Sequence, residues 1–413
     1  MTTICLVRCP SPFLIDERAF PPLGLMAVGA GLKRDGHDVV IYDGELEQLP
    51  LDYDQYGFGP TAPEYPHAID CLHRIKDVNP SARIVIGGPH VTLSRDRGDF
   101  DCMVIGDGEF AAHEAFFSDV FEVVAADLPL DEYPIPDRTL VDLRGYRFRL
   151  HDKPATTIMG SRGCPFRCGF CCKNHNRVRL NSAERMIEEI EILHNQFGYD
   201  ALAFPEDIFI LNRERTKRVC KHLKRRGIIW RCLVRADLVV KYGLGFLNMM
   251  TSSGCIGVGL GVESGSDEIL RNINKGETVA TMERAVGMLK QAGIFTKGFF
   301  ILGLPGESED TIKQTEAFLD RTQFDDIDCK IFTPYPGSPI FDNRDAYDVQ
   351  WDAIPLEYSF YKGRPGDYYG NVRTSRLTSA QIVEAWQRLE QTYKDWDRVI
   401  EGLMCDDLRE GVR

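Results

Sequence analysis

Short apolar strands alternate with helical patterns in two separate blocks of this chain. In the first block, residues 1–125, the strand-like runs and helices are Ile4–Arg8, Leu23–Asp35, Val39–Tyr42, His67–Val78, Arg83–Ile86 and Asp101–Ile105. Parallel strands need long crossover connections, which helices usually supply. This alternation predicts a doubly wound α/β domain, and such sheets bind ligands at the carboxyl ends of their strands, where glycines cluster here.

The second block, residues 151–345, contains six strand-like runs with helices between them. These runs are Thr156–Gly160, Ala201–Phe204, Ile228–Val234, Ile256–Val262, Thr296–Leu302 and Ile327–Phe332. A complete eight-stranded (βα) barrel typically needs ~250 residues, more than this block offers. We therefore predict a partial (βα)6 barrel of the TIM type, with its functional groups again at the carboxyl ends of the strands.

The remaining segments carry different patterns. Residues 126–150 are rich in proline and acidic side chains, which predicts a linker. Residues 346–413 combine an aromatic stretch with a helical pattern at Ser379–Glu401, capped by Thr378, and predict a small helical cap over the barrel mouth. In the barrel block, Asn181 and Glu184 have the spacing of a capping box at the start of a helix.

Charge and composition exclude several classes of partner. The formal net charge is −13, whereas a nucleic-acid partner requires a basic footprint. The basic run from Lys217 to Arg226 is interpreted as a solvated helix face. No run reaches the roughly 20 apolar residues of a membrane span, and the N-terminus lacks a signal-peptide pattern. We expect a cytoplasmic protein, and its 13 cysteines then indicate metal or redox chemistry rather than disulfides.

Four of those cysteines lie within nine residues, directly after the first strand of the barrel block. Cys164, Cys168 and Cys171 could direct three thiolates at one iron–sulfur cluster and leave one iron open for a ligand. The alternative is structural zinc, which usually takes four ligands and could recruit His175. Cys172 is adjacent to Cys171 and cannot easily join the other three.

This segment resembles the radical S-adenosylmethionine (SAM) superfamily, whose signature is three cysteines in CxxxCxΦC spacing. Phe170 occupies the aromatic position of that signature, where the resemblance implies contact with SAM. The resemblance implies a [4Fe–4S] cluster whose open iron binds the amino and carboxylate groups of SAM. Reductive cleavage would then give a 5′-deoxyadenosyl radical that abstracts hydrogen from substrate.

Later motifs follow the order of that superfamily, and the resemblance implies SAM-binding roles for them. Glu206 and Asp207 stand where members place an acidic group for the SAM amino group, and which of the two acts is open. Arg235 resembles an arginine near the SAM carboxylate or ribose, although an ion pair with Asp237 or a helix-end role is the alternative. Glu263, in a glycine-rich fourth-strand motif, would lie near the ribose. Two further segments, Phe300–Glu307 and Phe332–Ser338, resemble the ends of the fifth and sixth strands.

The first block resembles the cobalamin-binding domain of cobalamin-dependent radical SAM enzymes. The resemblance rests on Pro21–Leu25, Ile84–Thr92 and Val104–Glu109. It implies a pocket for the cobalamin nucleotide tail formed by Gly87, Gly88, Thr92 and Gly106. The Asp-x-His-x-x-Gly motif that ligates cobalt elsewhere is absent, and His90 is interpreted as a turn residue. The domain could instead keep its fold without the cofactor.

Together these features predict a radical SAM enzyme that methylates an unactivated carbon of a small secondary metabolite, as in antibiotic biosynthesis. An external reductant such as flavodoxin or ferredoxin is expected. A radical dehydratase or deoxygenase acting on a sugar-like diol is the main alternative. It would need an acid or base, for which four residues are candidates: Lys297, Glu307, Tyr335 and Tyr358. A non-catalytic electron carrier is disfavoured, because such proteins usually ligate every iron.

Overall fold

A computed structural model describes residues 3–11, 14, 16–175, 177–351 and 370–395, and the statements below concern these residues. They form two compact units. The first contains the described residues up to Arg147 together with residues 173–175. The second contains Phe148–Cys172 and the described residues from Arg177 onward. None of the described helices has both the length and the apolar character that crossing a bilayer requires.

The first unit is built on one sheet of six strands that are all parallel to their neighbours. The strands are β1 (Thr3–Val7), β2 (Asp38–Tyr42), β3 (Gln55–Phe58), β4 (Arg83–Ile86), β5 (Cys102–Ile105) and β6 (Glu122–Val124). Their spatial order is β2-β1-β3-β4-β5-β6. The order reverses direction at β1, as in other doubly wound sheets, and the predicted fold class is confirmed.

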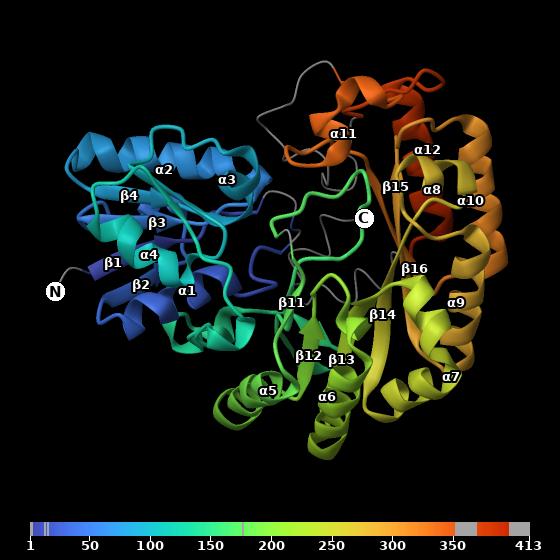
Figure 1. The fold of residues 1–413 in the computed structure, drawn as a ribbon, viewed down its shortest axis with the longest axis horizontal. Helices are drawn as coiled ribbons and strands as arrows, with labels where there is room; N and C mark the ends of the chain where they lie inside the picture. The colour runs from blue at the N-terminus through green and yellow to red at the C-terminus, as the bar shows by residue number, and fades with distance from the viewer. Residues whose placement is uncertain (1–2, 12–13, 15, 176, 352–369, 396–413) are drawn as a thin grey trace. The chain divides into compact units, whose positions relative to one another are not determined.

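Helices cover both faces of this sheet (Figure 1). One face packs against α1 (Leu23–Arg34) and α4 (Gly108–Phe117), the other against α2 (Tyr65–Val78) and α3 (Gly88–Ser94). Helices α1 and α4 cross closely at Gly31, since a Cβ there would lie only 1.9 Å from the carbonyl oxygen of Glu109. A glycine is therefore required for this packing.

Four elements of the first unit were not anticipated from the sequence: β3, β6, α3 and α4. Strand β3 reads Gln-Tyr-Gly-Phe, whose polar and glycine residues hide the fact that all four positions are buried. Helix α4 has apolar residues on several sides, so its helical period is weak. Residues 126–150 form three short 3-10 turns, at Leu130–Glu132, Arg138–Leu140 and Leu143–Gly145, in place of an open linker.

The second unit is built on the predicted open sheet of six parallel strands. The strands are β9 (Thr156–Thr157), β12 (Ala201–Phe204), β13 (Ile229–Val234), β14 (Cys255–Glu263), β15 (Phe295–Leu302) and β16 (Asp326–Ile331). Their order is β16-β15-β14-β13-β12-β9, so each strand lies beside the next one in the sequence. The partial (βα)6 barrel is thereby confirmed.

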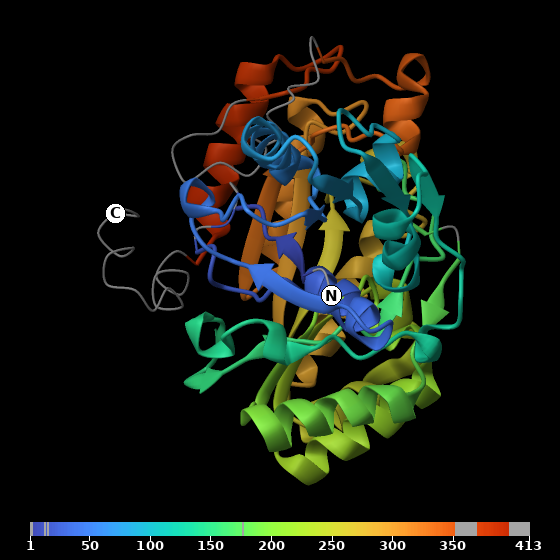
Figure 2. The same ribbon diagram turned by 90° about the vertical axis from the view of Figure 1, so that its left-hand side faces the viewer.

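The crossover helices cover the outer face of this sheet (Figure 1). They are α5 (Ala183–Phe197), α6 (Arg213–Arg226), α7 (Ala236–Ser252), α9 (Val279–Gln291) and α10 (Glu309–Thr322), with the short α8 (Asp267–Asn272) before α9. Figures 1 and 2 both show α5 and α6 side by side. Short strands β7 (Arg149–Leu150) and β8 (Lys153–Pro154) pair beside the sheet, and α11 (Pro339–Asp342) follows β16.

Two helix starts in the barrel block differ from those predicted. The cap of α5 is Ser182, whose hydroxyl accepts a hydrogen bond from the amide of Arg185, and not Asn181. Ser182 lies one residue closer to the helix and can reach that amide. Helix α7 starts at Ala236, because two helical pieces are joined across a kink at Gly243, the residue where the sequence had predicted the start.

Helix α12 (Ser379–Tyr393) lies along the edge strand β16 rather than over the barrel mouth (Figure 2). Trp386 Nε1 donates to the Cys329 carbonyl at 2.9 Å, and Glu390 Oε1 accepts from the Cys329 amide at 3.1 Å. These contacts satisfy backbone groups that an open edge would expose. Thr378 caps the helix as predicted, but the helix ends at Tyr393 and not at Glu401. Residues 396–413 lie outside the described residues.

Candidate active site

The predicted cluster loop leaves the first barrel strand and returns through a short antiparallel ladder. Strands β10 (Ser161–Arg162) and β11 (Arg179–Leu180) pair at its base, so the cysteines lie in the loop between them. Cys168 is buried, whereas Cys164 and Cys171 are half-buried. Gly163, with φ of 85°, directs the chain into the loop in a conformation that other residues rarely adopt.

Hydrogen bonds from two other parts of the second unit hold the middle of this loop. The Gly169 amide donates to the Ile273 carbonyl at 2.6 Å, and the Gly169 carbonyl accepts from the Ile340 amide at 3.0 Å. Asn274 Nδ2 donates to the Arg167 carbonyl at 2.9 Å. The contacts made by Ile273 and Asn274 therefore flank Cys168 on both sides, which fixes the loop at that cysteine.

The three predicted ligands are free thiols, the ligand type of an iron–sulfur cluster. Among the residues described here, no three His, Cys, Asp or Glu side chains are placed to hold one metal ion. Thiolates that bind a cubane attach to different irons and do not converge on one point, so this spacing is compatible with a cluster. Burial raises the pKa of the Cys168 thiol, while the charges of Lys275 and Arg235 oppose that rise and favour the thiolate.

Cys172 and His175 each have a contact of their own in the structure. The Cys172 thiol donates to the Tyr335 carbonyl at 3.7 Å, and burial raises its pKa to about 12. Cys172 is therefore a half-buried side chain for which the neutral thiol is favoured. His175 lies with Nε2 3.6 Å from Oδ1 of Asp107 in the first unit.

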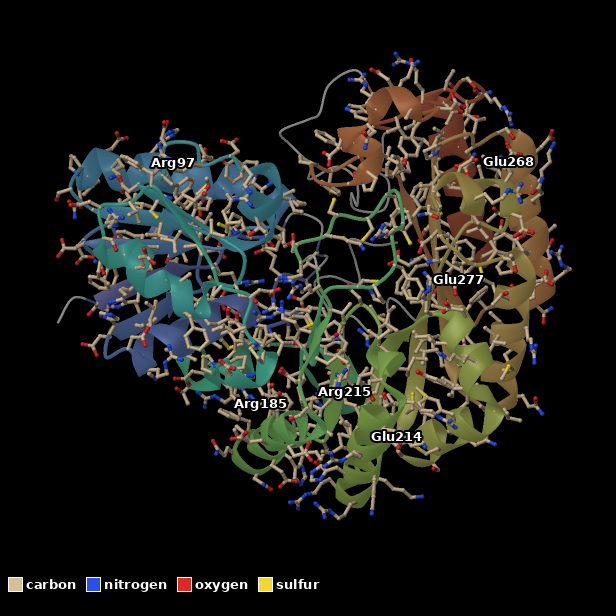
Figure 3. All side chains as sticks on the ribbon, in the orientation of Figure 1. Arg97, Arg185, Glu214, Arg215, Glu268 and Glu277 are labelled. Carbon is tan, nitrogen blue, oxygen red and sulfur yellow. The ribbon has the colours of Figure 1, made fainter. Side chains whose placement is uncertain are left out.

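The two acidic candidates after β12 have opposite environments. Glu206 is fully buried, and its carboxylate oxygens lie 2.9 and 3.1 Å from Nη2 of Arg215 on α6. Burial raises the pKa of Glu206, and the attraction of Arg215 opposes this. Asp207, the next residue, is exposed. Arg215 was not identified from the sequence, because it lies on helix α6 just before the basic run that begins at Lys217; Figure 3 labels it.

Arg235 and Glu263 belong to one buried network of charges at the carboxyl ends of β13 and β14. Arg235 Nε lies 3.2 Å from Asp237 Oδ1, which is the ion pair considered as an alternative, and its guanidinium stands 3.5 Å from the centre of the Phe166 ring. Glu263 Oε1 lies 2.7 Å from Nζ of Lys275. The network thus brings the two predicted SAM-binding residues to within reach of the cluster loop.

Lys275 and Glu277 complete this network and were missed in the sequence. Oε2 of Glu277 lies 3.8 Å from Lys275 and 3.4 Å from Arg235, without a hydrogen-bond partner among the described atoms (Figure 3 labels Glu277). Burial opposes the charge of Lys275, but Glu263 and Glu277 outweigh it and raise the pKa. The only sequence signal was a short polar run after the fourth-strand motif, typical of any loop.

The alternation of side chains along the barrel strands separates an outer from an inner face. Outward residues such as Trp230, Leu260, Phe300 and Cys329 are buried. The inner positions of β14 are glycines at 257, 259 and 261, those of β15 are apolar apart from Lys297, and those of β16 are charged. Lys297 pairs with Asp326 at 2.8 Å, and Lys330 pairs with Asp328 at 2.7 Å, with three of the four side chains partly exposed.

The other acid–base candidates do not form one cluster. Glu307 is completely buried and accepts a hydrogen bond from the Gly303 amide, and burial raises its pKa to about 8. Lys297 is held by Asp326. The Tyr335 carbonyl accepts from Cys172 and from Ser338. Tyr358 lies outside the described residues. Phe170 is half-buried in the cluster loop.

The predicted cobalamin residues meet at the carboxyl edge of the first unit's sheet. Gly88 has φ of 83°, and a Cβ there would lie 2.8 Å from backbone of Gly59. The Gly106 amide donates to Thr92 Oγ1 at 3.1 Å. The ends of β3, β4 and β5 thus lie close together and carry few bulky side chains. A surface of this kind would leave room for a nucleotide tail. Gly87 precedes α3 and shares this edge.

His90 is a packing residue in this structure. It lies on α3 rather than in a turn, it is buried, and its ring centre is 4.2 Å from that of Tyr65. Burial lowers the pKa of His90, so the neutral ring is favoured. The sequence-based view that it is not a cobalt ligand stays a prediction.

Comparisons with known proteins agree with both halves of the sequence analysis. The family model described as Radical SAM superfamily matches residues 158–319, and the model described as B12 binding domain matches residues 17–116. An uncharacterised methyltransferase of Pyrococcus horikoshii is 30% identical over 78% of this chain and 78% of its own length. The anaerobic magnesium-protoporphyrin IX monomethyl ester cyclase of Rubrivivax gelatinosus is 26% identical over 80% of this chain and 68% of its own.

A solved structure shows the same fold. The cobalamin-dependent SAM radical enzyme OxsB, with aqua-cobalamin and SAM bound, superposes with a TM-score of 0.66 at 21% identity. The superposition covers 84% of this chain, which spans 56% of the OxsB chain. This likeness concerns the fold alone.

Proposed function

We propose a reaction for this chain from one established premise: the chain belongs to the radical SAM superfamily, in the cobalamin-dependent methyltransferase family. Its cofactors are therefore a [4Fe–4S] cluster, SAM and cobalamin. The proposed reaction is the transfer of a methyl group to an unactivated carbon of a small polar molecule. The dehydration considered from the sequence is not favoured, because several of the relatives of this chain are methyltransferases.

One observation carries the proposal. A single chain combines a loop with three cysteines, anchored on both sides of Cys168, with a sheet edge walled by glycines such as Gly88. When bound, the cluster and SAM supply a 5′-deoxyadenosyl radical, and methylated cobalamin supplies the methyl group. The chemistry belongs to the cofactors, and the protein orients them and excludes water.

The protein's own residues divide this work. Cys164, Cys168 and Cys171 would hold the cluster and leave one iron for SAM. Asp207 is the better candidate for the SAM amino group, because Glu206 is already engaged by Arg215 inside the protein. Exposure of Asp207 at the end of β12 supports this assignment.

The charged inner positions of β16, together with Lys297 of β15, support a polar substrate. Burial opposes the charge of Asp328, but Lys330, Lys297 and Lys394 outweigh it and lower its pKa to about 2, so the carboxylate is ionised. A hydrocarbon substrate would have to desolvate these charges without replacing their contacts with water, which is costly. A substrate with hydroxyl, amino or carboxylate groups would instead hydrogen-bond to them.

The reductant and location remain those proposed from the sequence. Members of this family need an electron donor, and we propose flavodoxin or ferredoxin in the cytoplasm. The 13 cysteines support a reducing compartment, where thiols stay available for the cluster.

The proposal is tested by anaerobic purification, cluster reconstitution and incubation with hydroxocobalamin, followed by desalting. We expect stoichiometric corrin absorbance in the retained protein. Added SAM carrying a deuterated methyl group, with a reductant, should yield 5′-deoxyadenosine and label the bound corrin. SAM cleavage without any retained corrin would refute the methyl-transfer proposal and leave the first unit as a scaffold.

A further inference from the structure

The segment Ile273–Lys275, between α8 and α9, contacts the cluster loop and has no role assigned so far. Its first two residues hydrogen-bond the cluster loop at Gly169 and Arg167, one on each side of Cys168. The third, Lys275, has only 5% of its side chain exposed. Two of these three consecutive residues hold the loop by hydrogen bonds, and the third carries a buried positive charge.

The lysine is held in place by a glycine and a strained glutamate. Glu263 has φ of 67°, a left-handed conformation that costs free energy in a residue with a side chain. It presents Oε1 to Lys275 Nζ at 2.7 Å. A Cβ at Gly261 would lie 2.9 Å from that oxygen and 3.2 Å from Nζ, so the missing side chain makes room for the ion pair.

The backbone of the lysine is fixed as well. The Lys275 amide donates to the Leu270 carbonyl at 2.9 Å, and its carbonyl accepts from Arg235 Nη2 at 2.7 Å. Neither the main chain nor the ammonium group can therefore move without breaking buried hydrogen bonds. A charge fixed in this way acts at a constant distance from the loop.

We propose that Lys275 is a positioning residue whose ammonium group stabilises the reduced state of the cluster held by Cys164, Cys168 and Cys171. Reduction adds one negative charge to the cluster, and a fixed buried cation lowers the free energy of that state. Net charge and hydrogen bonds near the sulfurs are known to set the potentials of such clusters. Glu263 opposes this effect by its own charge while it holds the lysine in position.

This inference rests on the cluster assignment in the proposed function, and the test separates the two. Wild type, K275M, K275R and E263Q would be reconstituted anaerobically and titrated with dithionite against mediator dyes, without SAM. The electron paramagnetic resonance signal of the reduced cluster gives the midpoint potential, and iron analysis gives the loading. Lys290→Met is the matched control, since Lys290 is an exposed residue at the end of α9.

We expect K275M to shift the midpoint to a more negative value, K275R to restore most of that shift, and K290M to match wild type. E263Q removes a negative charge and should shift the midpoint the opposite way. If K275M does not retain iron, E263Q decides the question. An unchanged midpoint in loaded K275M, or in loaded E263Q, overturns the inference, whereas absence of iron from the wild type would instead overturn the cluster assignment.

Discussion

The Lys275 ammonium group lies 2.7 Å from a carboxylate oxygen of Glu263, in space that any side chain at position 261 would fill. The pair connects the end of β14 with a segment that hydrogen-bonds the cluster loop. Glu263 belongs to a strand motif that can be recognised in the sequence, whereas Lys275 does not. The pair is therefore visible only in the tertiary structure.

Replacing any one of the three loop cysteines should abolish cluster binding. We expect Cys164→Ala, Cys168→Ala and Cys171→Ala to lose most of the reconstituted iron and all detectable 5′-deoxyadenosine. The control is Cys172→Ala, whose thiol donates to the Tyr335 carbonyl and is not a predicted ligand. Retention of SAM cleavage in any of the first three variants would show that the ligand assignment is wrong.

The buried pair of Glu206 and Arg215 should be essential for stability. Removing one partner leaves an uncompensated buried charge, which typically costs about 3–5 kcal/mol. Arg215→Met should therefore lower the thermal unfolding midpoint by many degrees, as measured by circular dichroism. Glu214→Gln removes the neighbouring surface pair with Lys217, with 75% and 41% exposed side chains, and should change stability by less than about 0.5 kcal/mol. Equal effects of the two changes would contradict this assignment.

Gly88→Ala should impair the cobalamin-type edge of the first unit. Its φ of 83° disfavours alanine, and the added Cβ would meet Gly59 backbone at 2.8 Å. We expect reduced retention of hydroxocobalamin after desalting, with the iron content of the second unit preserved. The control is Gly287→Ala on α9, where a Cβ has open space and a helical alanine is favourable by about 0.5–1 kcal/mol. Full corrin retention in Gly88→Ala would place cobalamin elsewhere.

Glu307 should make the protein less stable as the pH rises. Burial raises its folded-state pKa from 4.5 to about 8, so folding takes up a proton between these values. The free energy of unfolding is therefore unaffected by Glu307 below about pH 4.5 and falls progressively until about pH 8, by at most about 5 kcal/mol.

The variant Glu307→Gln removes this titration and keeps an oxygen for the Gly303 amide. Thermal unfolding midpoints at pH 5.5 and pH 8 should fall less between the two values in the variant than in the wild type. Glu309→Gln, at an exposed position in the first turn of α10, should behave as wild type. Parallel curves for wild type and Glu307→Gln would show that Glu307 is ionised in the folded protein.

Local patterns were sufficient to predict both α/β units. The period of apolar residues and the positions of glycine are encoded in consecutive residues, as in Arg83–Ile86, where the predicted strand bounds are those of the structure. The spacing of Cys164, Cys168 and Cys171 is likewise local, and it predicts a loop whose three thiolates can bind one cluster. Strand β3 was missed because its burial comes from neighbours on both sides and not from its own composition.

By itself, the sequence determined the fold class and the family of this protein, and it predicted the cluster cysteines. Only the tertiary structure decided that Arg215 neutralises Glu206, that Lys275 pairs with Glu263, and that α12 covers the edge of β16. The physical reason is that hydrophobic periodicity predicts whether a side chain is buried. It does not predict which residue, distant in the sequence, that side chain contacts. The energy of a buried charge depends on that partner and its distance, which exist only once the chain has folded.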